Sequence, residues 1–328
     1  MAFLKSSIRE ISNIIYTQMS DKNLLIVLGS TAVGKTKLAV QLAKDFDGEI
    51  ISADSRQVFK GMDIGTGKDL SEYLLDNFQI PYHLIDIKKA GERYQVNAFK
   101  EDFYQSFQEI TDKGKLPILC GGTGMYIHSL LQNHELTAIP VNEALRGELA
   151  LLDRQQLRQR LDSFPSELRK QADYSSAKRL IRAIEIAQFL HENEDFVTTE
   201  RPQLKPLVIG LYNDVEKRRA KILSRLEERL SNGLIDEVQS LLSKGVSEEI
   251  LIFYGLEYKF VVAYLKNELN LATLKERLGT AICQFAKRQM TFFRKMEKDG
   301  VQINWIEAGE DKQAIKSKAV DLVKRNFT

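Results

Sequence analysis

The chain has 328 residues, of which 43% are hydrophobic and 28% charged, and it is long enough to fold into two globular domains. Its 47 lysines and arginines nearly balance 45 acidic residues, and the net charge of +2 excludes a polycation that binds nucleic acid over its whole surface. Two cysteines, Cys120 and Cys283, have no zinc-binding spacing, which indicates buried thiols in a reducing compartment. No apolar run approaches the ~20 residues of a membrane span, so we expect a cytoplasmic protein without membrane contact.

A glycine-rich segment, Gly29–Thr36, follows the apolar run of residues 24–28 and precedes an amphipathic run over residues 37–44. Strand, glycine-rich turn and helix are the context that the phosphate-binding pattern G-x-x-x-x-G-K-[ST], the P-loop, requires. Backbone amides and the helix N-terminus are predicted to face one anion, with a charge from Lys35 and a hydroxyl for Mg²⁺ from Thr36. The alternative is a chance match in an ordinary turn. The predicted phosphate-binding residues are Gly29, Ser30, Thr31, Ala32, Val33, Gly34, Lys35 and Thr36.

Asp54 lies just past the short apolar strand predicted at Ile50 and Ile51. In an open α/β sheet, ligands bind outside the carboxyl ends of the strands, so Asp54 is placed to face whatever the P-loop holds. A turn or N-cap aspartate is the structural alternative. The polar, glycine-bearing stretch of residues 56–68 is too long for a simple connection and favours a functional loop.

Two further predicted strands carry polar residues at their ends. Residues 82–87 form an apolar run that includes Asp86, whose position suits a carboxylate holding Mg²⁺ through water. Asp54 and Asp86 therefore compete for the roles of base and metal partner. Residues 116–120 run into Gly121-Gly122-Thr123-Gly124, where glycines and a threonine make a second cradle of amides with a hydroxyl. A tight turn is the alternative.

The pattern changes at about residue 134, and no strand is predicted again until about residue 204. Between Arg146 and Arg182, nine lysines and arginines face five acids, which predicts an inserted helical subdomain of net charge +4. Lys178, Arg179 and Arg182 lie within about one helical turn, beside apolar residues of the same helix. One face of this helix is therefore expected to be core and the other basic; a merely solvated face is the alternative to an RNA-binding one.

The sheet is expected to resume at residues 206–212, followed by a long helix over 215–243 that buries Ile222, Leu226, Leu230 and Leu234. Cations near a helix start are unfavourable unless something anionic is close, and four occur here: Lys217, Arg218, Arg219 and Lys221. The last predicted helix, residues 277–298, places Leu278, Ile282, Phe285 and Phe293 inward. It also presents a second basic surface with Phe292 close by, which suits RNA: Lys287, Arg288, Arg294, Lys295 and Lys298.

Taken together, the motifs resemble the tRNA dimethylallyltransferase (tRNA isopentenyltransferase) family, in its bacterial type without the zinc finger of some eukaryotic members. The shared segments follow the family's order over nearly the whole chain, and the Asp-Ser-Arg-Gln and Gly-Gly-Thr-Gly motifs are far more specific than the P-loop. These segments are Gly29–Thr36, Ile51–Phe59, Gly61–Lys68, His83–Ile87, Leu116–Tyr126, Arg179–Glu185 and Ala286–Arg294.

The resemblance implies transfer of a dimethylallyl group from dimethylallyl diphosphate to the exocyclic N6 amine of the adenine adjacent to the anticodon in tRNA, with release of diphosphate. The expected fold is α/β: a P-loop NTPase-like parallel sheet flanked by helices, formed by residues 1–133 and 204–328, with helices at its C-terminal end. Residues 134–203 are expected to form the inserted all-helical tRNA-binding subdomain. The expected ligands are the anticodon stem-loop, the prenyl donor and Mg²⁺, and we expect a monomer.

The resemblance also assigns roles. The counterpart of Asp54 is the general base for the amine, that of Thr123 assists at the diphosphate, and Lys35 stabilises the leaving diphosphate. The P-loop binds the diphosphate together with Mg²⁺, with Thr36 as the metal ligand, and the Asp-Ser-Arg-Gln loop holds the RNA. The residues predicted to bind tRNA are Asp54, Ser55, Arg56, Gln57, Thr123, Lys178, Arg179, Arg182, Lys287 and Arg288.

The chain departs from the family pattern at three places. The family has an Asp-Arg pair before the helix at 215–243, whereas here Val215 follows Asp214, and the usual arginine before Ile222 is Lys221. A short Gly-Tyr-Lys motif is lengthened to residues 253–259. Our hypothesis is that Lys221, helped by Arg218 or Arg219, binds the diphosphate in place of the missing arginine.

Two other functions stay open from the sequence. A small-molecule kinase would use the same P-loop for ATP, with Asp54 or Asp86 as base, but it explains neither the basic surfaces nor the Asp-Ser-Arg-Gln loop. A non-catalytic RNA-binding ATPase leaves Asp54 without a role.

Overall fold

A computed structural model of the chain describes residues 22–132, 135–197, 199–309 and 311–327. The sequence pattern predicts a short helix or arm at residues 1–22, and this segment lies outside the described residues except for Lys22 at the start of the first strand. Contacts divide the chain into two compact units: unit 1 is Met1–Gln132 with Pro202–Thr328, and unit 2 is Asn133–Arg201. The two units are described separately below.

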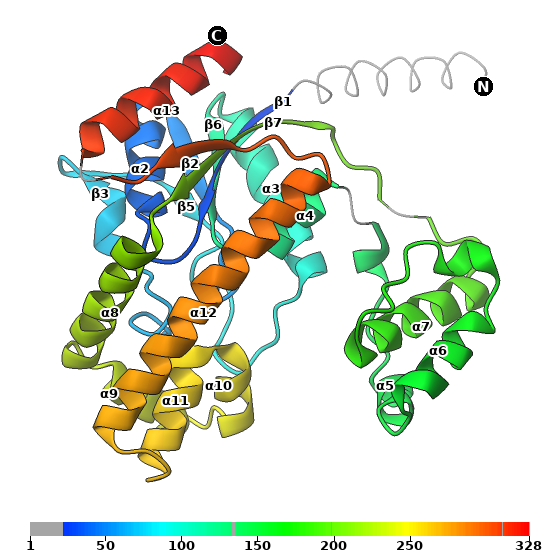
Figure 1. The fold of residues 1–328 in the computed structure, drawn as a ribbon. Helices are drawn as coiled ribbons and strands as arrows, with labels where there is room; N and C mark the ends of the chain where they lie inside the picture. Colours follow the sequence, from blue (N-terminus) through cyan, green and yellow to red (C-terminus); the bar gives the residue numbers. More distant parts are fainter. Residues whose placement is uncertain (1–21, 133–134, 198, 310, 328) are drawn as a thin grey trace, which may run out of the picture. The chain divides into compact units, whose positions relative to one another are not determined.

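Unit 1 is built on a six-stranded, fully parallel sheet with the order β5-β2-β6-β1-β7-β8 (Figure 1). Its central strand is β1, which pairs with β6 on one side and β7 on the other, so that Leu28 lies beside Gly121 and Gly29 beside Leu211. The strands are β1 (Lys22–Gly29), β2 (Gly48–Ser52), β5 (Tyr82–His83), β6 (Leu116–Gly121), β7 (Leu204–Tyr212) and β8 (Asn304–Glu307). This sheet agrees with the predicted parallel α/β fold.

The apolar run in β1 is explained by helices that cover both faces of the sheet. Leu25 and Val27 pack into a cluster with α2 (Lys35–Asp45) and α13 (Lys312–Phe327). Leu24, Ile26 and Leu28 pack into a second cluster on the opposite face, which includes residues of α3 (Val96–Asp112), α4 (Gly124–Leu131) and α12 (Leu271–Lys298). Because side chains alternate between two apolar layers, residues 24–28 include no polar position.

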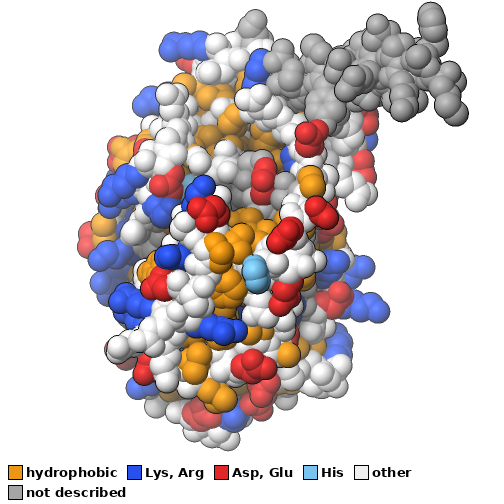
Figure 2. Space-filling model, turned by 90° about the vertical axis from the view of Figure 1, so that its right-hand side faces the viewer, with side chains coloured by type: hydrophobic (Ala, Val, Ile, Leu, Met, Phe, Trp, Pro, Cys, Tyr) orange, Lys and Arg blue, Asp and Glu red, His pale blue; other side chains and the backbone are white. Residues whose placement is uncertain are grey.

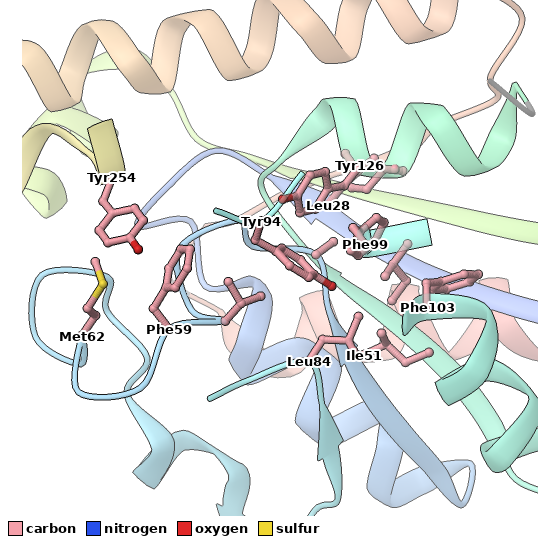
Figure 3. Packing of buried hydrophobic residues seen from close by; sticks show 14 of the residues in the cluster. Leu28, Ile51, Phe59, Met62, Leu84, Tyr94, Phe99, Phe103, Tyr126 and Tyr254 are labelled. Atoms are coloured by element: carbon pink, nitrogen blue, oxygen red, sulfur yellow. The ribbon is translucent and has the colours of Figure 1, made fainter. Parts of the chain in front are cut away.

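The remaining part of unit 1 is a group of short helices packed with α12 (Figure 1). It consists of α8 (Val215–Ser231), α9 (Leu234–Ser243), α10 (Glu248–Tyr254) and α11 (Leu256–Leu265). Aromatic side chains from α10, α3, α4 and the loop after β2 meet in one core (Figure 3). In this core, the rings of Phe59 and Tyr254 lie 4.2 Å apart and those of Phe99 and Tyr126 stack at 4.2 Å. A short helical turn and hairpin, η1 (Leu70–Tyr73), β3 (Leu74–Leu75) and β4 (Phe78–Gln79), precede β5.

Unit 2 is all-helical and has its own apolar core. It contains η2 (Glu135–Ala138), α5 (Glu143–Leu149), α6 (Arg154–Asp162), η3 (Ser166–Arg169) and α7 (Ala177–Glu192). Glu185 of α7 is 1% exposed, forms ion pairs with Arg146 and Arg182, and accepts the backbone amide of Asn142 at 2.7 Å. This buried carboxylate ties α7 to α5 and to the N-cap residue of α5.

The structure corrects four details of the sequence analysis. The strand predicted at 82–87 ends at His83, because Leu84 and Asp86 adopt positive φ angles of 61° and 56°, which an extended strand does not allow. The helix predicted over 215–243 is interrupted at Gly233, whose φ of 97° ends one helix and begins the next. Phe285 is 42% exposed rather than buried, and Cys283 is only half-buried.

The other cysteine, Cys120, is buried at the end of β6, and its burial raises the pKa of the thiol to about 12. The thiol is therefore protonated at neutral pH and acts as a small apolar group. Among the described residues, no helix combines the length and the hydropathy that are needed to span a membrane.

Candidate active site

The P-loop joins the carboxyl end of β1 to the first turn of α2, as the sequence predicts. Gly34 adopts a φ of 95°, a left-handed conformation that favours glycine. The Nζ atom of Lys35 donates a hydrogen bond to the carbonyl oxygen of Ser30 at 2.8 Å, which folds the lysine back over the loop. Lys35 and Thr36, the two residues predicted to meet phosphate and metal, are both half-buried.

Burial and the charges of nearby side chains both act on Lys35. Burial lowers the pKa of Lys35; the negative charge of Asp54 opposes this effect, whereas the positive charge of Arg225 adds to it. A bound diphosphate would reverse the lowering of this pKa, because an opposite charge favours the protonated amine. Asp54 and Arg225 therefore lie close enough to Lys35 to act on its charge.

A ladder of backbone hydrogen bonds brings Asp54 and Thr123 together. The amide of Ala53 donates to the carbonyl of Cys120 at 2.8 Å, and the amide of Thr123 donates to the carbonyl of Ala53 at 3.1 Å. The Oγ1 atom of Thr123 accepts the amide of Ser55 at 3.1 Å. A side chain at Gly121 would collide with the carbonyl of Ala53, so this approach of the two strand ends requires glycine there.

Asp54 itself is held in a local turn, in which its Oδ1 atom accepts the amide of Arg56 at 2.9 Å. Asp86, the competing carboxylate, is engaged elsewhere. It forms an ion pair with Lys68, a lysine whose side chain is 1% exposed and which also pairs with Asp63 at 2.6 Å. The geometry favours Asp54 over Asp86 as the group that faces the P-loop.

The Asp-Ser-Arg-Gln loop is braced by the polar loop that follows it. The side chain of Gln57 accepts a hydrogen bond from Ser52 Oγ at 3.1 Å and donates one to the carbonyl of Gly67 at 3.1 Å.

The guanidinium of Arg56 lies 5.8 Å from the centre of the Phe253 ring, and Phe253 is exposed. An exposed aromatic ring beside an arginine suits contact with an RNA base.

Arg225 is the residue of α8 that the sequence analysis missed. It is half-buried, forms an ion pair with Asp69 and donates to the carbonyl of Gly67 at 3.4 Å. One turn further along the helix, Arg229 pairs with Glu257 at 3.3 Å. The sequence signal for Arg225 was its place next to Leu226, on the side of the helix that the apolar spacing predicts to be buried.

The cationic start of α8 has a local explanation. Asp214 is the N-cap, and its Oδ1 atom accepts the amide of Lys217 at 2.8 Å, so an anion from the chain itself lies at this helix end. Lys217, Arg219 and Lys221 are exposed and Arg218 is half-buried. The binding of diphosphate by Lys221 stays a prediction, and Arg225 is an alternative to it.

The residues predicted to contact RNA differ in the exposure of their side chains and in their ion pairs within the protein. Lys287 and Arg288 of α12 are exposed, and so is Lys178 in unit 2. Arg179 is exposed but pairs with Asp173 at 2.7 Å. Lysine and arginine side chains are interspersed with acidic ones on the face drawn in Figure 2, as the small net charge suggests.

Arg182 is already occupied inside unit 2. Besides its ion pair with Glu185, it donates to the carbonyl oxygens of Leu136 at 3.1 Å and Ile139 at 2.8 Å. Its proposed contact with tRNA stays a prediction, and it would have to be made in addition to these bonds.

No metal-binding cluster of three or more His, Cys, Asp or Glu side chains occurs among the residues that the structure describes. A Mg²⁺ ion that binds together with a diphosphate does not need one, because phosphate oxygens and waters fill most of its six positions. The Thr36 hydroxyl, in the first turn of α2, is compatible with a metal ion that shares its ligands with a substrate.

The fold and the site together define a P-loop α/β protein in which a carboxylate at a neighbouring strand end lies near the lysine of the P-loop. Two family models match the chain: one described as IPP transferase over residues 57–296, and one described as isopentenyl transferase over residues 22–86. The chain belongs to this isopentenyl transferase family, which acts as a prenyltransferase and not as a small-molecule kinase.

Relatives with known names agree. The chain is 49% identical over 289 residues to tRNA dimethylallyltransferase 2 of Syntrophotalea carbinolica, a match that covers 88% of this chain and 95% of the relative. It is 46% identical over 295 residues to tRNA dimethylallyltransferase 1 of Syntrophus aciditrophicus, covering 90% and 96%.

Solved structures agree as well. The crystal structure of a tRNA isopentenylpyrophosphate transferase from Bacillus halodurans matches with a TM-score of 0.67 and 30% identity, over 93% of this chain and 98% of that one. A eukaryotic dimethylallyltransferase acting on tRNA has the same fold, with a TM-score of 0.75 and 23% identity over 94% of this chain and 79% of that one.

Proposed function

We propose that this chain transfers a dimethylallyl group from dimethylallyl diphosphate to the exocyclic N6 amine of the adenine adjacent to the anticodon in tRNA. The observation that carries the proposal is the ladder between residues 53–55 and 120–123, which holds Asp54 and Thr123 together, while the charge of Asp54 acts on the P-loop lysine. A base for the amine and a cradle for the diphosphate thereby share one edge of the sheet.

In this reaction a bond forms between N6 and the terminal carbon of the donor, and the bond from that carbon to the diphosphate oxygen breaks. Asp54 accepts the proton that N6 loses, because a weakly nucleophilic amine needs a positioned base. Lys35 and the P-loop amides stabilise the charge that grows on the leaving diphosphate, and Arg225 adds a guanidinium nearby. When bound, Mg²⁺ neutralises part of the same charge, with Thr36 as its protein ligand.

The adenine must leave the base stack before it reaches Asp54. The Ser55–Gln57 loop, Thr123 and the basic residues of α12 in unit 1 are proposed to bind the tRNA, and so, separately, are the basic residues of α7 in unit 2. Arg56 and Phe253 support this arrangement, because the backbone amide of Arg56 is bonded to Asp54 and its guanidinium lies beside the exposed ring of Phe253.

The test is mass analysis of an unmodified tRNA after incubation with the protein, Mg²⁺ and dimethylallyl diphosphate. One dimethylallyl group should appear on the adenine adjacent to the anticodon, and ATP should not replace the donor. An unmodified tRNA at enzyme excess, with tight binding of ATP, would overturn the proposal.

A further inference from the structure

Gln289 of α12 connects two loops that are far apart in the sequence. Its Oε1 atom accepts the backbone amide of Thr31 at 2.9 Å, and its Nε2 atom donates to the carbonyl of Gly122 at 2.8 Å. An N–H group only donates and a carbonyl only accepts, so the two partners fix the orientation of the side-chain amide. Both bonds are partly buried, which shields them from competition by water.

The two loops carry the two halves of the proposed reaction. Thr31 belongs to the P-loop, which is the donor side. Gly122 directly precedes Thr123, whose hydroxyl oxygen accepts the amide of Ser55 next to Asp54, which is the acceptor side. A single side-chain amide therefore lies between the diphosphate cradle and the loop that carries the base.

The packing around Gln289 leaves it little freedom. A Cβ atom at Gly122 would lie 2.5 Å from Nε2 of Gln289, and one at Gly124 would collide with the ring of Phe292, one turn along α12. Ala286 and Phe293 of the same helix are fully buried and anchor it in the core. The helix thus presents Gln289 and Phe292 to the second loop at close range.

We propose that Gln289 is a positioning residue for prenyl transfer, which sets the separation of the P-loop from the Gly122–Thr123 loop and so aligns the donor carbon with the amine. The inference rests on the proposed function, because it assumes that both loops hold substrates. Reactive groups that are out of place by about 1 Å lose about 10²-fold in rate, so a bridge of this kind acts on the transfer step.

Gln289→Met tests the bridge, because methionine keeps most of the volume and removes both hydrogen bonds. We expect the single-turnover rate at saturating donor and tRNA to fall about 10- to 100-fold, with the affinity for each substrate nearly unchanged. Gln289→Glu keeps the acceptor for Thr31 but loses the donor to Gly122, so its rate should lie in between. Gln284→Met is the matched control, because Gln284 is an exposed glutamine on the same helix.

Hydrogen exchange of the Thr31 amide gives a readout without any substrate. The amide should exchange faster in Gln289→Met than in the wild type, and Gln289→Glu should restore most of its protection. If Gln289→Met does not fold, Gln289→Glu carries the kinetic test against the wild type.

A wild-type rate in the folded Gln289→Met variant would overturn the proposal. So would a loss of rate that is fully explained by a smaller folded fraction, because that result indicates a structural role only. If the wild type transfers no prenyl group, the proposed function fails, whereas the exchange of the Thr31 amide still shows whether the bridge exists.

Discussion

Replacing Arg225 by alanine tests whether this arginine, and not Lys221, is the cation of α8 that acts on the diphosphate. Arg225 lies near enough to Lys35 to lower its pKa, whereas Lys221 is exposed. Loss of one group that stabilises a developing oxyanion costs about 10²–10³ in rate. Because Arg225 is partly exposed and paired with Asp69, we expect a loss in rate at the lower end of this range, about 10²-fold, which corresponds to an activation free energy higher by ~2.7 kcal/mol.

The assay is the single-turnover rate at saturating donor for Arg225→Ala, Arg225→Lys and Lys221→Ala, with Arg219→Ala as the exposed control on the same helix. Arg225→Lys should recover part of the rate, since lysine keeps the charge but not the planar fork of donors. A normal rate for Arg225→Ala together with a slow Lys221→Ala would refute this reasoning and favour the hypothesis drawn from the sequence.

Three further predictions concern pH, stability and RNA. Lys35 must be protonated to attract the diphosphate, and its pKa is lowered from the ordinary lysine value of 10.5, so the affinity for the donor should already decrease with rising pH at values below 10.5. Titration calorimetry at several pH values measures this decrease. Arg225→Ala removes a charge that lowers the pKa of Lys35 and should therefore shift the decrease to higher pH. Glu185→Gln should lower the free energy of unfolding by about 3 kcal/mol, the lower end for a broken buried ion pair, because both arginine partners are partly exposed. Burial alone raises the pKa of Glu185, but hydrogen bonds from Arg146 and Arg182 outweigh this effect, and the pKa is lowered. The stabilisation by Glu185 is therefore present above the unfolded-state pKa near 4.5 and is lost as the pH falls through the lower pKa of the folded state. Urea unfolding at several pH values measures this loss. The affinity for tRNA should fall steeply with increasing salt concentration. The double substitution Lys178→Ala and Arg179→Ala should reduce this affinity without changing donor affinity or stability, whereas Arg182→Ala should also destabilise unit 2. An unchanged tRNA affinity in filter binding would exclude these residues from the RNA contact.

The sequence predicted best what depends on local pattern and on the rules of parallel sheets. The P-loop was recognisable from a buried strand, a glycine-rich turn and a helix start. Asp54 and the Gly121–Gly124 turn were each predicted at a strand end beside the P-loop, and the hydrogen bond between Ser55 and Thr123 shows that these two strand ends are adjacent.

Other features depend on contacts that no local pattern contains. Gln289 and Thr31 are 258 positions apart, so their hydrogen bond could not be seen in the sequence. Arg182 seemed part of a basic face because two of its partners, the carbonyls of Leu136 and Ile139, are more than 40 positions away. Its third partner, Glu185, lies three positions further along the same helix and was visible in the sequence. By contrast, the helix break at Asn232-Gly233 had a local signal, since glycine after asparagine commonly ends a helix.

The most direct test of the account is the single-turnover rate of prenyl transfer by Asp54→Asn. Asparagine keeps an oxygen that can accept the Arg56 amide, so the loop should hold its shape while the base is lost. We predict a rate about 10²–10⁴ lower than that of the wild type, with tRNA and donor still bound at wild-type affinity. A nearly normal rate, with the dimethylallyl group on the same adenine, would contradict the role of Asp54 as the base.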